Sequence, residues 1–398
     1  MTVKYLIGAL VALASTAAAA QPRPFDRGAW LKDYDRLKVA LAQDYANLDW
    51  QAERRGLNLA SADRMISAML EKADSDVAAT LIFAKLVDAF RDPHLELSPG
   101  PPPPSATLVP RASAVDGAAA LPAGCDSYSN GNAATRLPYT KAPGWTEVSA
   151  GPFLAGTIGD IGIIRIPGFD EQRYLNACKA AARPGLSGRD LQLATRAELN
   201  RQLGALVGQL KAHGVKRLAI DLSRNGGGSE WSSDAAAMLA AGQLARTEPR
   251  RVGPSCDRSM IWKGEKPPCS PYSGQPTRET IENEGPPVWD GPLAILADRR
   301  TASAAEEVIT WLRDNGKAVM GGERTFGAGC GYMDGGNSFA FEAAPMHLMI
   351  PNCSRFTKDG VNEIEGQAPD LAIDWQMLAP ADVPATLDRL FALAPKPA

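Results

Sequence analysis

The second half of the chain alternates short apolar runs with amphipathic stretches, and this alternation restricts its possible folds more than any other feature. The apolar runs cover residues 161–169 (IGIIRIPGF), 215–222 (VKRLAIDL), 291–298 (GPLAILAD) and 317–323 (KAVMGGE). Helical patterns separate them over residues 194–214, 232–245 and within 299–317. Strands separated by helices predict an α/β layer with largely parallel strand pairing.

The N-terminal part has a different pattern, with helical periodicity from about residue 25 to residue 97. Apolar residues recur at spacings of three and four in residues 25–48 and 76–90. Ser75 is the predicted N-cap of the second of these helices. Pro93 makes continuation beyond it unfavourable. A small helical layer is therefore expected before the α/β part.

These patterns divide the chain into four segments. We expect a signal peptide over residues 1–20 and an N-terminal helical domain over 21–98. A Pro- and Gly-rich linker with loops should cover 99–155, and the α/β domain 156–398. Residues 112–155 are rich in Gly, Ser, Pro and Asn, so we predict loops there, held in place by Cys125.

The N-terminus is typical of a secretory signal. One early lysine precedes an apolar stretch, and small residues then run up to Ala20, the expected cleavage point. The alternative is a buried helix of the mature protein. We expect an exported protein, periplasmic or extracellular, with no stable membrane span after cleavage, because the apolar stretch is short for a span.

Six cysteines become informative in an exported chain, because such a chain meets an oxidising compartment. Six cysteines allow 15 connectivities, which sequence alone cannot distinguish. Our hypothesis pairs sequence neighbours: Cys125 with Cys178, Cys256 with Cys269, and Cys330 with Cys353. The last pair would brace a hairpin, since residues 338–345 and 346–353 both have strand character.

Composition excludes some classes of function. The formal charge is −3, from 45 acidic and 42 basic side chains, so the chain lacks the excess of basic residues typical of nucleic-acid-binding proteins. No C-x-x-C pair is present, which argues against a zinc or thioredoxin-like site. We expect no metal and no organic cofactor.

A glycine-rich junction follows the strand predicted at 215–222, in the sequence SRNGGGSEW. Glycines let backbone amides approach a ligand closely. Phosphate-loop and dinucleotide motifs are absent. The junction is either a flexible turn or a backbone-amide site for an oxyanion, formed by Gly226 or Gly227.

A second strand–helix junction contains Ser303, followed three residues later by Glu306. This is the sequence form of a helix capping box. The same position places a hydroxyl at the positive end of the helix dipole, beside the unpaired amide of Ala304. Ser303 is therefore a cap, a nucleophile, or both.

A nucleophilic serine needs a base, and the chain has only three histidines. His213 ends an amphipathic helix and His347 lies in an apolar strand, so both favour structural roles. His94 lies in a short turn after the helical layer, which makes it the best candidate for the base.

Several segments together resemble the tail-specific (C-terminal-processing) serine peptidases, in the branch of tricorn protease and the interphotoreceptor retinoid-binding protein repeats. They are YANLDW at 45–50, FRDPHLEL at 90–97, GIIRIPGF at 162–169, DLSRNGGG at 221–228, the segment 299–329 and NEIEGQAPD at 362–370. The resemblance implies a ClpP/crotonase-like α/β core. The PDZ module of many relatives is not evident between His94 and that core.

The resemblance also implies roles for individual residues. Ser303 occupies the position of the nucleophile, whereas Ala328 stands where relatives with a Ser/Lys dyad have lysine. The base then corresponds to His94 and the third member to Glu363, with Glu365 as the alternative if the alignment slips by two residues.

We therefore expect a serine endopeptidase that hydrolyses peptide or protein substrates through Ser303, His94 and Glu363. The amides of Gly226 or Gly227 and of Ala304 would form its oxyanion hole. Trp231 and Phe326 would line a substrate pocket or, equally, serve as packing aromatics. The alternatives are a secreted non-catalytic binding protein on a peptidase-like scaffold and a structural envelope protein. The sequence does not predict the oligomeric state.

Overall fold

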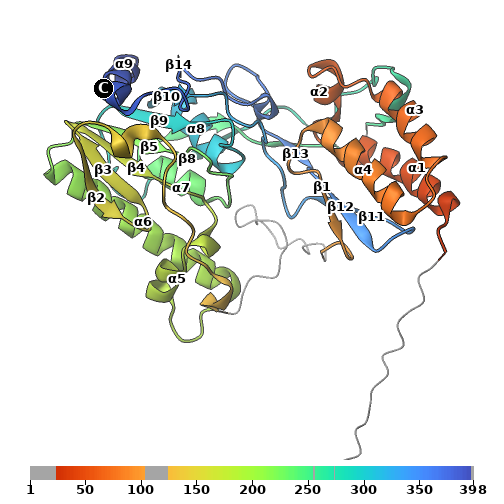
Figure 1. The fold of residues 1–398 in the computed structure, drawn as a ribbon, viewed down its shortest axis with the longest axis horizontal. Coiled ribbons are helices and arrows are strands. Elements are labelled where there is room, and N and C mark those ends of the chain that lie inside the picture. Colours follow the sequence, from red (N-terminus) through yellow and green to blue (C-terminus); the bar gives the residue numbers. More distant parts are fainter. Residues whose placement is uncertain (1–23, 104–123, 254–255, 273, 396–398) are drawn as a thin grey trace, which may run out of the picture.

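The computed structural model describes residues 24–103, 124–253, 256–272 and 274–395 (Figure 1). The predicted signal segment lies outside these residues. Within them the chain forms two bodies, a large mixed sheet covered by helices and a helical layer on a smaller sheet (Figure 1).

The large sheet has seven strands in the order β14-β10-β9-β5-β4-β3-β2. Pairing is parallel from β14 to β4 and antiparallel from β4 to β2. The strands are β2 (Trp145–Ala150), β3 (Leu154–Ile158), β4 (Ile161–Arg165), β5 (Arg217–Asp221), β9 (Leu293–Ala297), β10 (Ala318–Gly322) and β14 (Leu371–Ala372). The four predicted strands are confirmed as β4, β5, β9 and β10.

The loop prediction for residues 112–155 is wrong over β2 and the start of β3. β2 is the edge strand of the sheet, and its residues are exposed or only partly buried. An edge strand lies at the margin of the sheet, where little of its surface faces the core. It therefore needs no continuous run of apolar residues. The sequence signal for a strand was therefore weak.

Both faces of the large sheet are covered, which explains its nearly continuous apolar strands. Leu218 and Ile220 of β5 pack with one group of helices, whereas Ala219 faces the other side, toward the C-terminal helix. The helices are α5 (Leu175–Ala181), α6 (Gly188–Ala212), α7 (Trp231–Met238), α8 (Ala304–Asp314) and, on the opposite face, α9 (Val383–Phe391). The helix predicted over 232–245 ends at Met238, and its last residues belong to β6 (Leu244–Thr247), which pairs with β8 (Arg278–Ile281).

The second body combines the N-terminal helices with a hairpin from the later part of the chain. Helices α1 (Arg27–Asp44), α2 (Leu48–Glu53), α3 (Leu59–Leu70) and α4 (Asp76–Phe90) lie beside a sheet of order β1-β12-β11 (Figure 1). Its strands are β1 (Glu96–Pro99), β12 (Met346–Ile350) and β11 (Asn337–Ala340). The predicted hairpin thus forms, and it shares one apolar core with the N-terminal helices. A short ladder joins β7 (Arg250–Arg251) to β13 (Cys353–Ser354).

Local signals placed the boundaries of α4 correctly. The Ser75 hydroxyl accepts a hydrogen bond from the Ala78 amide at 3.3 Å, as expected of an N-cap. The helix ends at Phe90, and Arg91 adopts a left-handed conformation two residues before Pro93. The chain then turns directly into the segment that carries His94.

All three predicted disulfides are confirmed: Cys125–Cys178, Cys256–Cys269 and Cys330–Cys353. None of the helices in the described ranges is both long enough and apolar enough to cross a membrane.

Candidate active site

The two predicted junctions meet at one edge of the large sheet. β5 and β9 are adjacent and parallel, so the loops at their carboxyl ends emerge side by side. The Ala302 amide donates to the Asn225 carbonyl at 2.9 Å, and the Thr301 hydroxyl to the Leu222 carbonyl at 2.9 Å. The glycine loop and the serine loop are therefore joined by hydrogen bonds.

Ser303 has an unusual backbone conformation at the start of α8. Its φ is 55° and its ψ is −120°, a region that non-glycine residues rarely adopt. The sharp turn leaves Ser303 partly exposed while Ala304 and Ala305 are buried. Such a turn from strand to helix raises the hydroxyl above the sheet edge, as a nucleophile requires.

The His94 imidazole reaches Ser303 from the other body. Its Nε2 lies 3.2 Å from the Ser303 Oγ, although the residues are 209 positions apart. The structure thus brings together the two side chains that the sequence singled out as nucleophile and base. Nδ1 lies 3.2 Å from the carbonyl oxygen of Ala328.

Two neighbours in the 325–332 loop fix the orientation of the imidazole. Gly331 packs against the ring so closely that a Cβ there would lie 2.7 Å from Nε2. The Tyr332 ring meets the imidazole edge-on at 5.4 Å, and its hydroxyl donates to the His94 carbonyl. His94 has little rotational freedom in this setting.

Asp92 is a site residue that the sequence analysis missed. It is buried, its Oδ1 accepts the His94 amide at 3.0 Å, and that oxygen lies 3.6 Å from the imidazole Nδ1. The Tyr45 hydroxyl donates to its other oxygen at 2.9 Å. An aspartate two residues before a candidate histidine was the available signal.

The contacts of Glu363 differ from those expected of a residue that orients the imidazole. One carboxylate oxygen accepts from the Thr310 hydroxyl and the other from Arg355 Nε, both at 2.5 Å. Glu365, the alternative, accepts a hydrogen bond from the Trp50 indole in the helical layer. The Nδ1 contacts are with Ala328 and Asp92.

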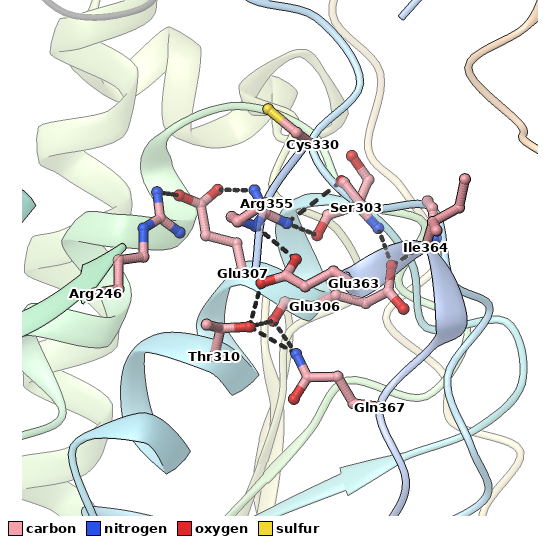
Figure 2. A network of polar contacts seen from close by, with 12 residues as sticks. Arg246, Ser303, Glu306, Glu307, Thr310, Cys330, Arg355, Glu363, Ile364 and Gln367 are labelled. Atoms are coloured by element: carbon pink, nitrogen blue, oxygen red, sulfur yellow. Dashed lines mark hydrogen bonds and ion pairs between the residues drawn. The ribbon is translucent and has the colours of Figure 1, made fainter. Parts of the chain in front are cut away.

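Arg355 connects Glu363 to the serine turn. Its Nη2 donates to the carbonyls of Ser303 at 3.2 Å and of Gly329 at 3.3 Å. Figure 2 shows the carboxylates of Glu307 and Glu363 directed at this guanidinium, whereas that of Glu306 lies at the Ser303 amide. Sequence alone gave no signal for Arg355, because its role depends on contacts between distant segments.

The pKa values in this cluster follow from burial and charge. Burial by itself lowers the pKa of Arg355, but the carboxylates of Glu363 and Glu307 outweigh it and raise that pKa. Burial raises the pKa of Glu307, but Arg246 and Arg355 outweigh it and lower that pKa to about 2. Burial raises the pKa of Glu306, and the charge of Glu363 adds to this effect.

The three predicted oxyanion donors occupy different environments. The Ala304 amide begins α8 and so has no acceptor within the helix. The Gly227 amide donates to the Asn225 side chain at 2.9 Å. Gly227 has a φ of 102°, and a Cβ there would lie 2.8 Å from the Ala304 nitrogen. Around Gly226 the space is open.

The two candidate pocket residues, Trp231 and Phe326, differ in their exposure to solvent. Trp231 is fully buried among Phe153, Phe169 and Tyr174. It is therefore a packing aromatic, with no surface left for a substrate. Phe326 is 44% exposed. It borders a cavity of about 320 Å³ whose wall includes Pro93 and Leu95, the residues on either side of His94.

No cluster of three His, Cys, Asp or Glu side chains that could hold a metal ion occurs among the residues with described positions.

Comparison with known proteins agrees with this geometry. Residues 160–365, just over half of the chain, match the model of peptidase family S41. The chain belongs to this family, which confirms the resemblance inferred from its motifs.

Individual relatives match over limited lengths. The chain is 32% identical over 122 residues to a carboxyl-terminal-processing protease of a Picosynechococcus species, covering 30% of this chain and 24% of the relative. It is 29% identical over 149 residues to the protein of that name from a Synechocystis species, covering 37% and 30%. The chain thus spans less than a third of the length of either relative.

Solved structures share the fold over nearly the whole chain. Mature CPAF complexed with lactacystin matches with a TM-score of 0.61 at 14% identity, over 92% of this chain and 98% of that one. A peptidase described as putative from Parabacteroides merdae matches with a TM-score of 0.55 at 14% identity, over 90% and 95%. The predicted fold class, an α/β core preceded by a helical region, is confirmed.

Proposed function

We propose that this protein is an exported serine endopeptidase in which Ser303 is the nucleophile and His94 the general base. The observation that carries the proposal is the 3.2 Å separation of His94 Nε2 and Ser303 Oγ. The two residues come from separate bodies of the fold, so their approach is not a by-product of local structure. Family membership supports a peptide or protein substrate.

In the first half-reaction, Ser303 Oγ attacks the scissile carbonyl and its proton passes to His94 Nε2. The carbonyl oxygen becomes an oxyanion, which the Ala304 amide and the glycine loop at Gly226 and Gly227 stabilise. The Gly227 amide would share its proton between the oxyanion and the Asn225 side chain. Each such donor contributes about 3 kcal/mol to transition-state binding. The intermediate collapses when the imidazolium protonates the leaving amine, which departs and leaves an acyl-enzyme.

In the second half-reaction, water attacks the acyl-enzyme and gives a proton to His94. Collapse of the second tetrahedral intermediate breaks the ester bond, and His94 returns the proton to Ser303. The cavity beside Phe326 would receive a side chain of the substrate, since it adjoins the segment that carries the base.

In this proposal Glu363 acts on the site through Arg355 and not by a direct hydrogen bond to the imidazole. Its contact with Arg355 neutralises a buried guanidinium that holds the Ser303 carbonyl. Export is supported by the N-terminal signal pattern and by three disulfides, which form in oxidising compartments.

The test is covalent labelling by a fluorophosphonate probe, which reacts with activated serines. We expect the wild-type protein to be labelled and both Ser303→Ala and His94→Ala to lose labelling while retaining the wild-type circular dichroism spectrum. Labelling that persists in Ser303→Ala would contradict the nucleophile assignment. Absence of labelling in the wild type would favour a binding protein on a peptidase scaffold.

Two further variants distinguish the candidate glutamates. Glu363→Gln should slow labelling about tenfold or more, because Arg355 would keep a buried charge with a weakened partner. Glu365→Gln should stay within about threefold of wild type, since its indole contact lies away from the imidazole. The reverse result would assign the third role to Glu365.

A further inference from the structure

Glu306 lies directly behind the candidate site and accepts an unusually complete set of hydrogen bonds. It is fully buried in the first turn of α8. Its Oε1 accepts from the Thr325 hydroxyl at 2.5 Å and the Gly327 amide at 2.8 Å. Its Oε2 accepts from the Ser303 amide at 3.0 Å and the Ala328 amide at 2.9 Å.

One atom, Oε2 of Glu306, therefore holds the backbone on both sides of the reacting pair. The Ser303 amide belongs to the residue that carries the nucleophile. Ala328, whose amide the same oxygen accepts, also carries the carbonyl that faces His94 Nδ1 at 3.2 Å. A closed circuit results, from Ser303 through Glu306 and Ala328 to His94 and back to Ser303 Oγ.

This circuit selects the tautomer of the imidazole. A backbone carbonyl can only accept, so the Ala328 oxygen favours a proton on His94 Nδ1. Nε2 is then unprotonated and able to take the Ser303 proton. The position at which related dyads would carry a lysine thus supplies, through its carbonyl, the group that orients the base.

The four donors favour the ionised carboxylate and so oppose the effect of burial on its pKa. Three of them are backbone amides, which can only donate, and the fourth is the Thr325 hydroxyl. The charged neighbours that act on Glu306 are Glu363 and Arg355, both on the C-terminal segment. Burial of such a group is costly unless its hydrogen bonds are complete, which they are here.

We propose that Glu306 is a positioning residue that sets the nucleophile turn and the tautomer of His94 together through one carboxylate. This inference rests on the proposed function, because it assigns Glu306 a role in the reaction of Ser303.

The experiment compares the rate of fluorophosphonate labelling as a function of pH in wild type, Glu306→Gln and Glu306→Asp. In Glu306→Gln one carboxylate oxygen becomes an amide donor that faces donors, so labelling should slow at least tenfold. The midpoint of its pH profile should also fall by about half a unit or more, because a buried negative charge near the imidazolium is lost. Glu306→Asp keeps the charge but is shorter, so it should label slowly with an unchanged midpoint.

The matched control is Asp33→Asn, which alters another fully buried carboxylate. Asp33 accepts the amides of Glu342 at 2.9 Å and Ala343 at 2.8 Å, in the helical body. This variant should lose stability in thermal melts yet label at the wild-type rate and midpoint at temperatures where it is folded.

Each outcome bears on one claim. A folded Glu306→Gln that labels within threefold of wild type with the same midpoint would overturn the inference and leave Ser303 as the nucleophile. If Glu306→Gln does not fold, wild-type labelling by Glu306→Asp would overturn it instead. Labelling of Ser303→Ala would overturn the proposed function itself.

Discussion

At the scale of single residues, the site depends on conformations that few residue types can adopt. Ser303 occupies a strained region with φ at 55°, and the strain is compensated by the Glu306 contact to its amide. Gly227 faces this turn with a φ of 102°. A side chain at that position would occupy the space above the Ala304 amide, where an oxyanion is expected to bind.

This gives a prediction for Gly227→Ala. The new Cβ would lie 2.7 Å from Ser303 Cβ and 2.8 Å from the Ala304 nitrogen, so labelling should fall at least about 100-fold. Gly214→Ala is the control, because Gly214 has a similar positive φ of 82° but open space around it. That variant should lose stability by about 1 kcal/mol and keep its labelling rate. Equal losses of labelling in both variants would mean that backbone strain, not the filled space, is responsible.

At the scale of elements, the loop between β10 and β11 determines where the base sits. Ala328 and Gly331 of this loop both contact the His94 imidazole. The Cys330–Cys353 disulfide ties the loop to β13, and the Asn352 amide donates to the Gly331 carbonyl at 3.2 Å. The disulfide therefore restrains the wall against which the imidazole packs.

Removing this disulfide should affect both stability and reactivity. The double variant Cys330→Ala/Cys353→Ala should lose about 3 kcal/mol in urea unfolding, as expected for a closure of 23 residues. Its labelling rate should fall severalfold, because the loop behind the imidazole is less restrained.

The control for this prediction is the variant Cys256→Ala/Cys269→Ala, which removes a disulfide of separation 13. It should lose a comparable amount of stability with its labelling rate unchanged. A drop in labelling in both double variants would show that reactivity follows global stability alone.

At the scale of the whole molecule, a buried ionic cluster joins segments that are far apart in sequence. Glu307 on α8 pairs with Arg246 on β6 and with Arg355 on the C-terminal segment. The lowered pKa of Glu307, about 2, means that the folded state binds its proton more weakly than the unfolded chain does. The stability that this carboxylate contributes is therefore present above its unfolded value of about 4.5 and lost as pH falls toward 2.

We expect Glu307→Gln to be less stable than wild type at pH 7 by about 3 kcal/mol, and this difference to shrink between pH 4.5 and pH 2. Urea unfolding at several pH values measures it. Glu342→Gln is the control: Glu342 forms an exposed ion pair with Lys32, so little change is expected at any pH. If the difference in unfolding free energy between wild type and Glu307→Gln stays constant with pH, the lowered pKa of Glu307 is contradicted.

Much of the molecule was readable from sequence, because the signals concerned are local. Apolar runs predicted β4, β5, β9 and β10, Ser75 marked the start of α4, and the expectation of export led to the prediction of the disulfides. Motif order pointed to Ser303 and His94. The edge strand β2 was missed because it lies at the margin of the core, where its residues are exposed or only partly buried, and so it lacks a continuous apolar run.

Only the tertiary structure decided which groups surround the reacting pair. Hydrogen bonds between distant segments placed the Ala328 carbonyl at the imidazole and the Arg355 guanidinium at the Ser303 carbonyl. Tertiary packing also buried Trp231 and joined the β11–β12 hairpin to the N-terminal helices. Periodicity and capping act over a few residues and are written in the sequence, whereas partners across 200 positions are selected by how packed layers bring their loops together.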